Sequence, residues 1–394
     1  MIPEVRAKIE HIQLRSISEG YKKSKVGVIP DAWCCYQIHE CLSICNYERK
    51  PISEDVRKTI PGPYPYYGPT QAQGYIATYE SEGPAVLIGE DGDHFLKYKN
   101  QEMTMYVDGK YTVNNHAHVL RGTELCETKW FYYAYQHKSL FDAITRQGAG
   151  RYKLTKEALI KLSLQCPPIE EQKKIISILN TQDKVIKLKE KRLAEKQRQK
   201  KYLMQQLLTG KKRLPWFLKS WKTVELGEIF NYIQPTAYLV KTTDYDDSYK
   251  TPVLTAGKTF ILGYTNETEG VFTKVPVVIF DDFTTATKYV DFPFKVKSSA
   301  MKILTIKDGL SIVFAYEAMQ LIKFTVGGHE RHWISKYSCL TIDIPDIEEQ
   351  TAIAEVLSTA DREIELLQQD IEQEKQKKKA LMQLLLTGIV RVKT

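Results

Sequence analysis

A chain of 394 residues is too long for one ordinary hydrophobic core and suits two domains, because most domains hold about 100–200 residues. Hydrophobic residues make up 43% of the chain and no run of about 18 apolar residues occurs, which argues against a disordered protein and against membrane-spanning helices. The formal net charge of +8 fits a polyanionic partner, while the lack of a signal-like start and of any Cys-x-x-Cys pair favours a reduced, cytoplasmic protein.

Residues 1–166 are predicted to form a first α+β domain. An Ile-Pro-x-x-Trp opening stands at Ile29–Trp33. Short apolar runs such as Ala85–Ile88 and Val119–Leu120 predict strands, because clusters of Gly, Pro, Asn and Asp bound them. Lys129–Arg146 is predicted to be a helix. Long polar loops therefore separate the strands of this domain.

Residues 167–213 are predicted to form one long, Lys-rich helix. Pro168 suits the first turn, where its missing N–H costs nothing, and Gly210 suits a left-handed cap at the end. About 42 residues at 1.5 Å each give roughly 60 Å of helix. Such a helix is far longer than those of an ordinary globular domain.

Residues 214–344 repeat the first domain faintly. The segment opens on Leu218-Lys219-Ser220-Trp221, and Val277–Asp282 parallels Val86–Asp91. We therefore expect the two domains to share an α+β fold but not a surface. Further strands are predicted at Thr273–Phe280 and Ala300–Ile306.

Residues 345–394 are predicted to form a second long helix, which copies the first without a gap when Pro345 is aligned with Pro167. Pro-Pro-Ile-Glu-Glu-Gln at 167–172 returns as Pro-Asp-Ile-Glu-Glu-Gln at 345–350, where Asp346 and Glu349 have the spacing of a capping box. Apolar residues at heptad spacing predict that the two helices pack as a coiled coil. This seam comprises Leu179, Ile186, Leu193 and Leu207 in the first copy and Leu357, Ile364, Ile371 and Leu385 in the second.

The two helices differ in the sign of their charge. Between Pro168 and Leu214 there are fourteen Lys and Arg against five Asp and Glu, whereas between Asp346 and Val392 there are six against ten. A basic and an acidic helix with matching seams are expected to pair with each other. Lys200 and Lys378 interrupt both seams at the same place, and either a contact device or a solvated stretch explains this shared break.

The chain resembles the specificity subunits of type I restriction–modification enzymes. The resemblance rests on the repeated Ile-Glu-Glu-Gln motifs at 169–172 and 347–350, the Leu-Leu-Thr-Gly ends at 207–210 and 385–388, and the opening at Ile29–Trp33. It covers nearly all of the chain, although Leu218–Trp221 departs from the Ile-Pro-x-x-Trp opening. The family implies an α+β fold with two target-recognition domains and two long helices that form an antiparallel coiled coil about a pseudo-two-fold axis.

The resemblance implies a subunit without catalytic residues. Each recognition domain would read one half of a split double-stranded DNA target, and the coiled coil would set the gap and bind two methylation subunits. Restriction subunits would join in the full enzyme. No cofactor is expected on this chain, since S-adenosylmethionine, ATP and Mg²⁺ would bind to the partner subunits.

Three pairs of polar loops at corresponding places are the candidate DNA contacts, because Arg and Lys suit guanine, Asn and Gln suit adenine, and Thr is adaptable. In the first domain the candidates are Tyr66, Gln71, Gln73, Lys97, Arg146, Gln147 and Arg151. In the second domain they are Thr255, Lys258, Thr259, Thr284, Thr285, Lys288, His329 and Arg331. A residue in these loops can equally be solvated surface or contact a phosphate.

Other chemistry is weakly supported by the sequence. Ala256–Thr259 resembles the end of a phosphate-binding loop, but Pro252 stands where a Gly is required. We expect no metal site, because aligning Trp33 with Trp221 replaces the crowded Cys and His residues with mixed and apolar ones. The crowded residues are Cys34, Cys35, His39, Cys41 and Cys45. The alternatives that stay open are a methyltransferase without restriction subunits and, less favoured, a coiled-coil scaffold that does not recognise DNA.

Overall fold

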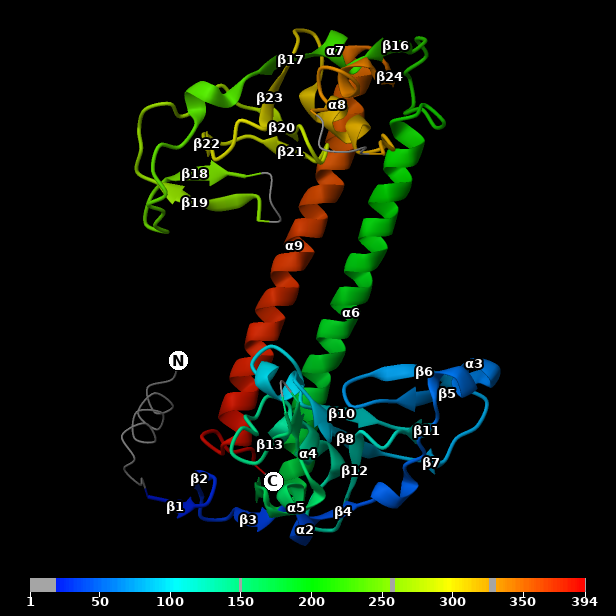
Figure 1. The fold of residues 1–394 in the computed structure, drawn as a ribbon, viewed down its shortest axis with the longest axis vertical. Helices are drawn as coiled ribbons and strands as arrows, with labels where there is room; N and C mark the ends of the chain where they lie inside the picture. Colours follow the sequence, from blue (N-terminus) through cyan, green and yellow to red (C-terminus); the bar gives the residue numbers. More distant parts are fainter. Residues whose placement is uncertain (1–18, 149–150, 256–258, 326–330, 394) are drawn as a thin grey trace. The chain divides into compact units, whose positions relative to one another are not determined.

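The computed structural model describes residues 19–148, 151–255, 259–325 and 331–393 (Figure 1). The chain forms two compact units. Unit 1 holds the described residues up to Leu188 together with those from Ile371 onward, and unit 2 is Lys189–Asp370. Each unit therefore contains one globular α+β part and a portion of both long helices. Among the described residues, no helix combines the length and apolar character needed to cross a bilayer.

Two four-stranded sheets form the centre of unit 1. The first has the order β10-β8-β12-β4 and the second the order β6-β5-β11-β7, in which β11 runs parallel to β5. Their strands are β4 (Leu42–Ile44), β5 (Pro61–Tyr67), β6 (Ala72–Ile76), β7 (Ser81–Glu82), β8 (Ala85–Gly89), β10 (Thr104–Val107), β11 (Lys110–Val113) and β12 (Ala117–Gly122). All five residues of β8 are buried, which explains its unbroken apolar sequence.

Smaller elements complete unit 1. The remaining strands are the hairpin β1 (Tyr21–Ser24) and β2 (Gly27–Pro30), the pair β3 (Cys34–Gln37) and β15 (Ser163–Cys166), and the three-stranded sheet of β13 (Thr145–Arg146), β14 (Tyr152–Lys153) and β9 (Asp91–Gly92). The short helices are α2 (Ile38–Cys41), α3 (Glu54–Thr59), α4 (Thr128–Tyr135) and α5 (Lys156–Lys161). In the main core, Trp33 and Trp130 pack edge to face with ring centroids 5.8 Å apart.

Unit 2 repeats this arrangement. Its sheets have the orders β17-β23-β20-β21 and β19-β18-β22, again with one parallel pair, β18 and β22. The strands are β16 (Lys222–Glu225), β17 (Phe230–Ile233), β18 (Thr251–Leu254), β19 (Ile261–Thr265), β20 (Val277–Asp281), β21 (Thr287–Val290), β22 (Lys295–Val296), β23 (Met301–Ile306) and β24 (Thr341–Ile344), and the short helices are α7 (Leu226–Ile229) and α8 (Ile312–Met319). The matching strand orders confirm that the two domains share a fold.

One predicted helix is shorter than expected. The segment Lys129–Arg146 is helical only in α4, which ends at Tyr135, and Thr145–Arg146 instead forms β13. The backbone of β13 pairs with β14, so that Arg146 lies opposite Tyr152. The strand β14 in turn pairs with β9 (Asp91–Gly92), far away in the chain, and this three-stranded pairing outweighs the local helix propensity.

The two long helices are α6 (Ile169–Leu207) and α9 (Ile347–Leu386) (Figure 1). Gly210 and Gly388 follow them with φ of 66° and 74°, as predicted for left-handed caps. Within unit 1 Gln182 contacts Glu374, and within unit 2 Lys196 contacts Glu363 with an N–O distance of 2.6 Å. In both units an early part of one helix meets a late part of the other, so the helices pack antiparallel.

Most residues of the predicted seam are buried. Six of its residues are buried, whereas Leu193 and Ile364 are half-buried. The buried residues are Leu179, Ile186, Leu207, Leu357, Ile371 and Leu385.

Candidate nucleic-acid interface and its support

A buried carboxylate joins the globular part of unit 1 to the long helices. Glu171 on α6 is fully buried and accepts a hydrogen bond of 3.1 Å from the indole N–H of Trp33. Arg391, which follows α9, donates to both of its oxygens from Nε and Nη2 at 2.6 and 2.7 Å. This two-pronged pairing is the strong form of a carboxylate–guanidinium contact. It connects the domain opening, the start of α6 and the end of α9.

Unit 2 contains the same junction with the helices exchanged. Glu349 on α9 accepts from Trp221 at 3.1 Å and from Nε and Nη2 of Arg213 at 2.6 Å each. The gap-free repeat of the two helices relates Glu171 to Glu349 and Arg213 to Arg391. Asp346 caps α9 by accepting from the backbone N–H of Glu349 at 3.0 Å. The predicted capping box is thus only half formed, because the Glu349 carboxylate is engaged by Arg213.

The glutamine of each repeated motif ties its helix to the domain. Gln172 donates to the carbonyl of Pro167 at 2.9 Å and accepts from the backbone N–H of Glu127, which caps α4. Gln350 likewise donates to the carbonyl of Pro345 at 2.8 Å and accepts from the N–H of Ser311, which caps α8. Both glutamines are buried, so their amides satisfy backbone groups that water does not reach. The repeated Glu-Gln pair therefore anchors each long helix to its globular part.

The polar breaks in the seams are contact devices. Lys200 pairs with Asp361 on α9 at 2.6 Å and with Glu317 on α8 at 3.0 Å. Burial disfavours its charge, but hydrogen bonds to Asp361 and Glu317 outweigh burial and raise the pKa of Lys200. In unit 1 Lys378 pairs with Asp183 at 2.6 Å, and Asp183 also accepts from the hydroxyl of Tyr133 on α4. Each lysine thus links both long helices to a helix of the domain.

The three predicted loops of unit 1 meet around a turn that the sequence analysis did not single out. This turn, Asn114–His116, joins β11 to β12. The side chain of Asn114 donates to Gln73 at 3.2 Å, and the ring of His116 lies 3.0 Å from Asp91 in β9. Because β9 pairs with β14, Tyr152 and Lys153 of the third predicted loop region lie at the same place. The exposed Asn115 and His116 follow a buried strand, and this polar run was the available signal for them.

Most candidates of unit 1 are exposed at this convergence. Gln147 follows β13 and Arg151 precedes β14, and the N–H of Gln147 donates to the carbonyl of Arg151 at 2.7 Å. Lys97 is exposed and pairs with Asp93 at 2.9 Å. The other exposed candidates are Gln71, Gln73 and Arg146.

Tyr66 lies in the core rather than on the surface. It is 1% exposed, its hydroxyl donates to the carbonyl of Lys50 at 3.1 Å, and it accepts from the N–H of Ile52. Since a buried and fully engaged side chain cannot reach DNA without rearrangement, we remove Tyr66 from the candidate contacts.

In unit 2 the structure brings the loop that holds Thr284 and Thr285 close to residues 331–333. The Asp282 carboxylate, at the end of β20, accepts from the N–H of Trp333 at 2.8 Å, and its carbonyl accepts from His332. Arg331 is exposed beside this contact, and Lys288 is exposed on β21. Thr284 turns its hydroxyl inward to Asp281 at 2.6 Å, and Thr285 has φ of 58° in the same turn. Those two threonines therefore shape the loop.

The first loop of unit 2 is described in part. Thr255 is half-buried and its N–H donates to the carbonyl of Phe260 at 2.9 Å, while Thr259 is exposed. Lys258 and His329 lie outside the described residues. The exposed Lys297, directly after β22, occupies the place that the Asn114–His116 turn has after β11, and it was missed because it lies outside the three predicted loops.

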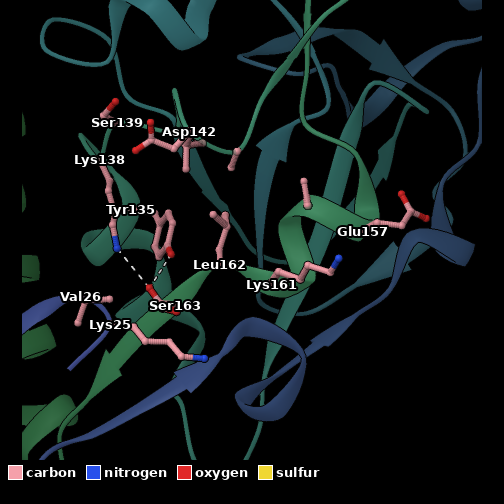
Figure 2. A pocket seen from close by; sticks show the side chains of 13 residues that line it. Lys25, Val26, Tyr135, Lys138, Ser139, Asp142, Glu157, Lys161, Leu162 and Ser163 are labelled. Carbon is pink, nitrogen blue, oxygen red and sulfur yellow. Dashed lines mark hydrogen bonds between the residues drawn. The ribbon is translucent and has the colours of Figure 1, made fainter.

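A cavity of about 630 Å³ lies elsewhere on unit 1, between α4, α5 and the β1–β2 hairpin. Figure 2 shows the Lys138 amine and the Tyr135 hydroxyl pointing to the backbone oxygen of Ser163, at 3.2 and 2.8 Å. Burial lowers the pKa of Lys138. The Lys138 amine and the Tyr135 hydroxyl are thus both engaged with the backbone, which fits a structural role for this cavity.

Comparisons with known proteins agree with this architecture. The model of the type I restriction modification DNA specificity domain matches residues 30–197 and 219–376. An Escherichia coli specificity subunit, of the type I restriction enzyme EcoR124I/EcoR124II, is 58% identical over 126 residues, which are 30% of this chain and 31% of that protein. The putative MjaX specificity subunit of Methanocaldococcus jannaschii is 24% identical over 95% of this chain and 98% of its own length.

A solved structure shows the same fold. The S subunit of a type I restriction–modification system from M. genitalium has a TM-score of 0.69 at 13% identity, over 96% of this chain and all of that one. The two matched segments of the family model cover both globular parts and most of both long helices. The chain therefore belongs to the type I restriction–modification DNA specificity family.

Proposed function

We propose that this chain is the DNA-recognition subunit of a type I restriction–modification complex and that each unit reads one half of a bipartite target. The observation that carries the proposal is the repeated junction, in which Trp33, Glu171 and Arg391 recur as Trp221, Glu349 and Arg213. The junction supports both domains in the same way, whereas the loops of the two domains differ in sequence. Two domains of one fold with different loops, joined by the same two helices, suit a DNA target whose two halves differ in sequence.

The long helices would set the gap between the halves. A helix of 39 residues extends about 58 Å, and one turn of DNA measures 34–36 Å. Helices that pair through ion pairs and a buried seam resist bending, so they can hold a constant gap. A flexible linker bends and could not. The same helices would bind two methylation subunits, because the pseudo-symmetry of the repeats offers two equivalent surfaces.

The reaction steps would belong to partner subunits. We propose that the methylation subunits bind S-adenosylmethionine, that restriction subunits with ATP and Mg²⁺ join in the full enzyme, and that this chain supplies no catalytic residue. A restriction gene beside the gene for this chain would support the full enzyme, and its absence would support a methyltransferase alone.

Substitutions in exposed loop residues test how the halves are read. With Gln71→Ala we expect relaxed discrimination in one half-target, by about 1–3 kcal/mol at one base pair if the amide contacts adenine. With Thr259→Ala we expect a smaller loss confined to the other half. Methylation of DNA duplexes that carry single changes in either half measures both effects.

Gln205→Ala is the matched control for Gln71→Ala, because Gln205 is exposed on α6 away from the loops. The control should leave the ranking of the duplexes unchanged. If all loop variants keep the ranking of the unsubstituted chain, the assignment of these loops to base reading is wrong.

A further inference from the structure

Three buried thiols from distant parts of the chain meet in unit 1. Cys41 ends α2, Cys126 lies between β12 and α4, and Cys166 ends β15. Their sulfur atoms all lie within 4.8 Å of one another, and their exposed fractions are 0%, 0% and 2%. Of the cysteines and histidine that crowd together in the sequence near Cys41, only Cys41 belongs to this cluster.

The fold itself does not require thiols at this place. In unit 2, Ile229 ends α7 as Cys41 ends α2, and Ile344 ends β24 as Cys166 ends β15. Leu310 precedes Ser311, the partner of Gln350, as Cys126 precedes Glu127, the partner of Gln172. Ile229, Leu310 and Ile344 belong to one apolar core. Unit 2 thus packs hydrocarbon where unit 1 gathers three sulfur atoms.

The spacing suits a shared metal ion. Metal–sulfur bonds of about 2.3 Å place the sulfur atoms of a tetrahedral or trigonal site about 3.8–4.0 Å apart. This spacing is compatible with three sulfur atoms that lie within 4.8 Å of one another. Each thiol that becomes a ligand would release one proton when the cation binds.

We propose that Cys41, Cys126 and Cys166 bind one thiophilic closed-shell cation, Zn²⁺ or Cu⁺, as a structural centre of unit 1. Soft thiolates select these ions over Mg²⁺ or Ca²⁺. Among the described residues no fourth His, Cys, Asp or Glu joins the cluster. Three thiolates suffice for Cu⁺, whereas Zn²⁺ would take its fourth ligand from outside this set. The centre would tie α2, the segment before α4, and β15 together at the base of the recognition domain.

Metal analysis of the full chain tests the proposal. The chain is purified under reducing conditions, refolded with Zn²⁺ or with Cu⁺, dialysed against metal-free buffer and analysed for both metals. We expect about one ion per chain from one of the two arms, and the arm that loads identifies the ion. If the Zn²⁺ arm loads, refolding with Co²⁺ should give near-ultraviolet absorption from sulfur-to-cobalt charge transfer. Substoichiometric metal in both arms would overturn the proposal.

The residues at the matching positions of unit 2 suggest the test variants. Cys126→Leu and Cys166→Ile introduce the side chains that unit 2 has, and each should lower the retained metal by about tenfold or more while the circular dichroism spectrum stays that of a folded chain. Cys45→Ala is the matched control, because Cys45 is also buried but lies outside the cluster, and it should keep the metal. Retention of the metal by both cluster variants would assign it to other residues and contradict the proposal. If the variants do not fold, the metal content of the unsubstituted chain in the two arms decides.

Discussion

Methylation of the original target is expected to be lost when one heptad is inserted into each long helix, after Leu188 in α6 and after Asp370 in α9. Seven residues lengthen each helix by about 10.5 Å and keep the apolar seam in register. That distance corresponds to about three base pairs, or roughly a third of a DNA turn. The second reader would then face the wrong side of the duplex. Methylation assays on the original target, with assembly checked by size-exclusion chromatography, measure the loss.

Three inserted heptads provide the matched control. They lengthen each helix by about 31.5 Å, which is close to the 34–36 Å of one turn, so both readers face the major groove again. Methylation should return on targets whose gap is longer by about nine or ten base pairs. A single-heptad chain that still methylates the original target at full rate would show that the helices do not set the gap.

Arg391→Met is expected to lower the free energy of unfolding of unit 1 by about 2–3 kcal/mol. The change removes both hydrogen bonds from a carboxylate that is fully buried, and leaves Glu171 with the Trp33 N–H. Losing one partner of a buried ion pair costs about 3–5 kcal/mol of unfolding free energy. Because the Arg391 side chain is partly exposed, we expect a loss near or below the lower end of this range. Hydrogen exchange in increasing urea, followed peptide by peptide, assigns the loss to unit 1.

The repeat offers a paired test of the same contact. Arg213→Met should destabilise peptides of unit 2 by a similar amount, because its junction with Glu349 has the same geometry. Arg362→Met is the control for a lost positive charge, since Arg362 is exposed on α9. Equal effects of all three substitutions would show that net charge, and not the junction, governs stability.

The repeated features could be predicted from the sequence because periodicity and duplication are visible in it. The gap-free copy of residues 167–213 near the C-terminus located both long helices, their glycine caps and their seam, and the opposite charges predicted their pairing. Sequence alone did not reveal why Glu171 and Gln172 recur. Their partners Arg391 and Glu127 are far away in the chain, so the motif acquires its meaning only from folding.

The loops and the thiol cluster were predicted less well for the same reason. Gln71 and Arg146 were proposed from residue type, but the turn that unites their loops, at Asn114–His116, carries no repeat signal. Cys41 attracted notice through its sequence neighbours, whereas its structural partners Cys126 and Cys166 stand far along the chain from it. Convergence of distant segments depends on sheet order, which local patterns do not encode.

The central claim is that two domains read two halves of one DNA target across a gap held by the helices. Sequencing that detects modified adenines, in DNA from cells that express this chain with the proposed methylation subunits, tests it most directly. The account predicts one motif with two specified halves separated by unspecified base pairs of constant number. A single continuous motif, a gap of variable length, or methylation without sequence preference would contradict it.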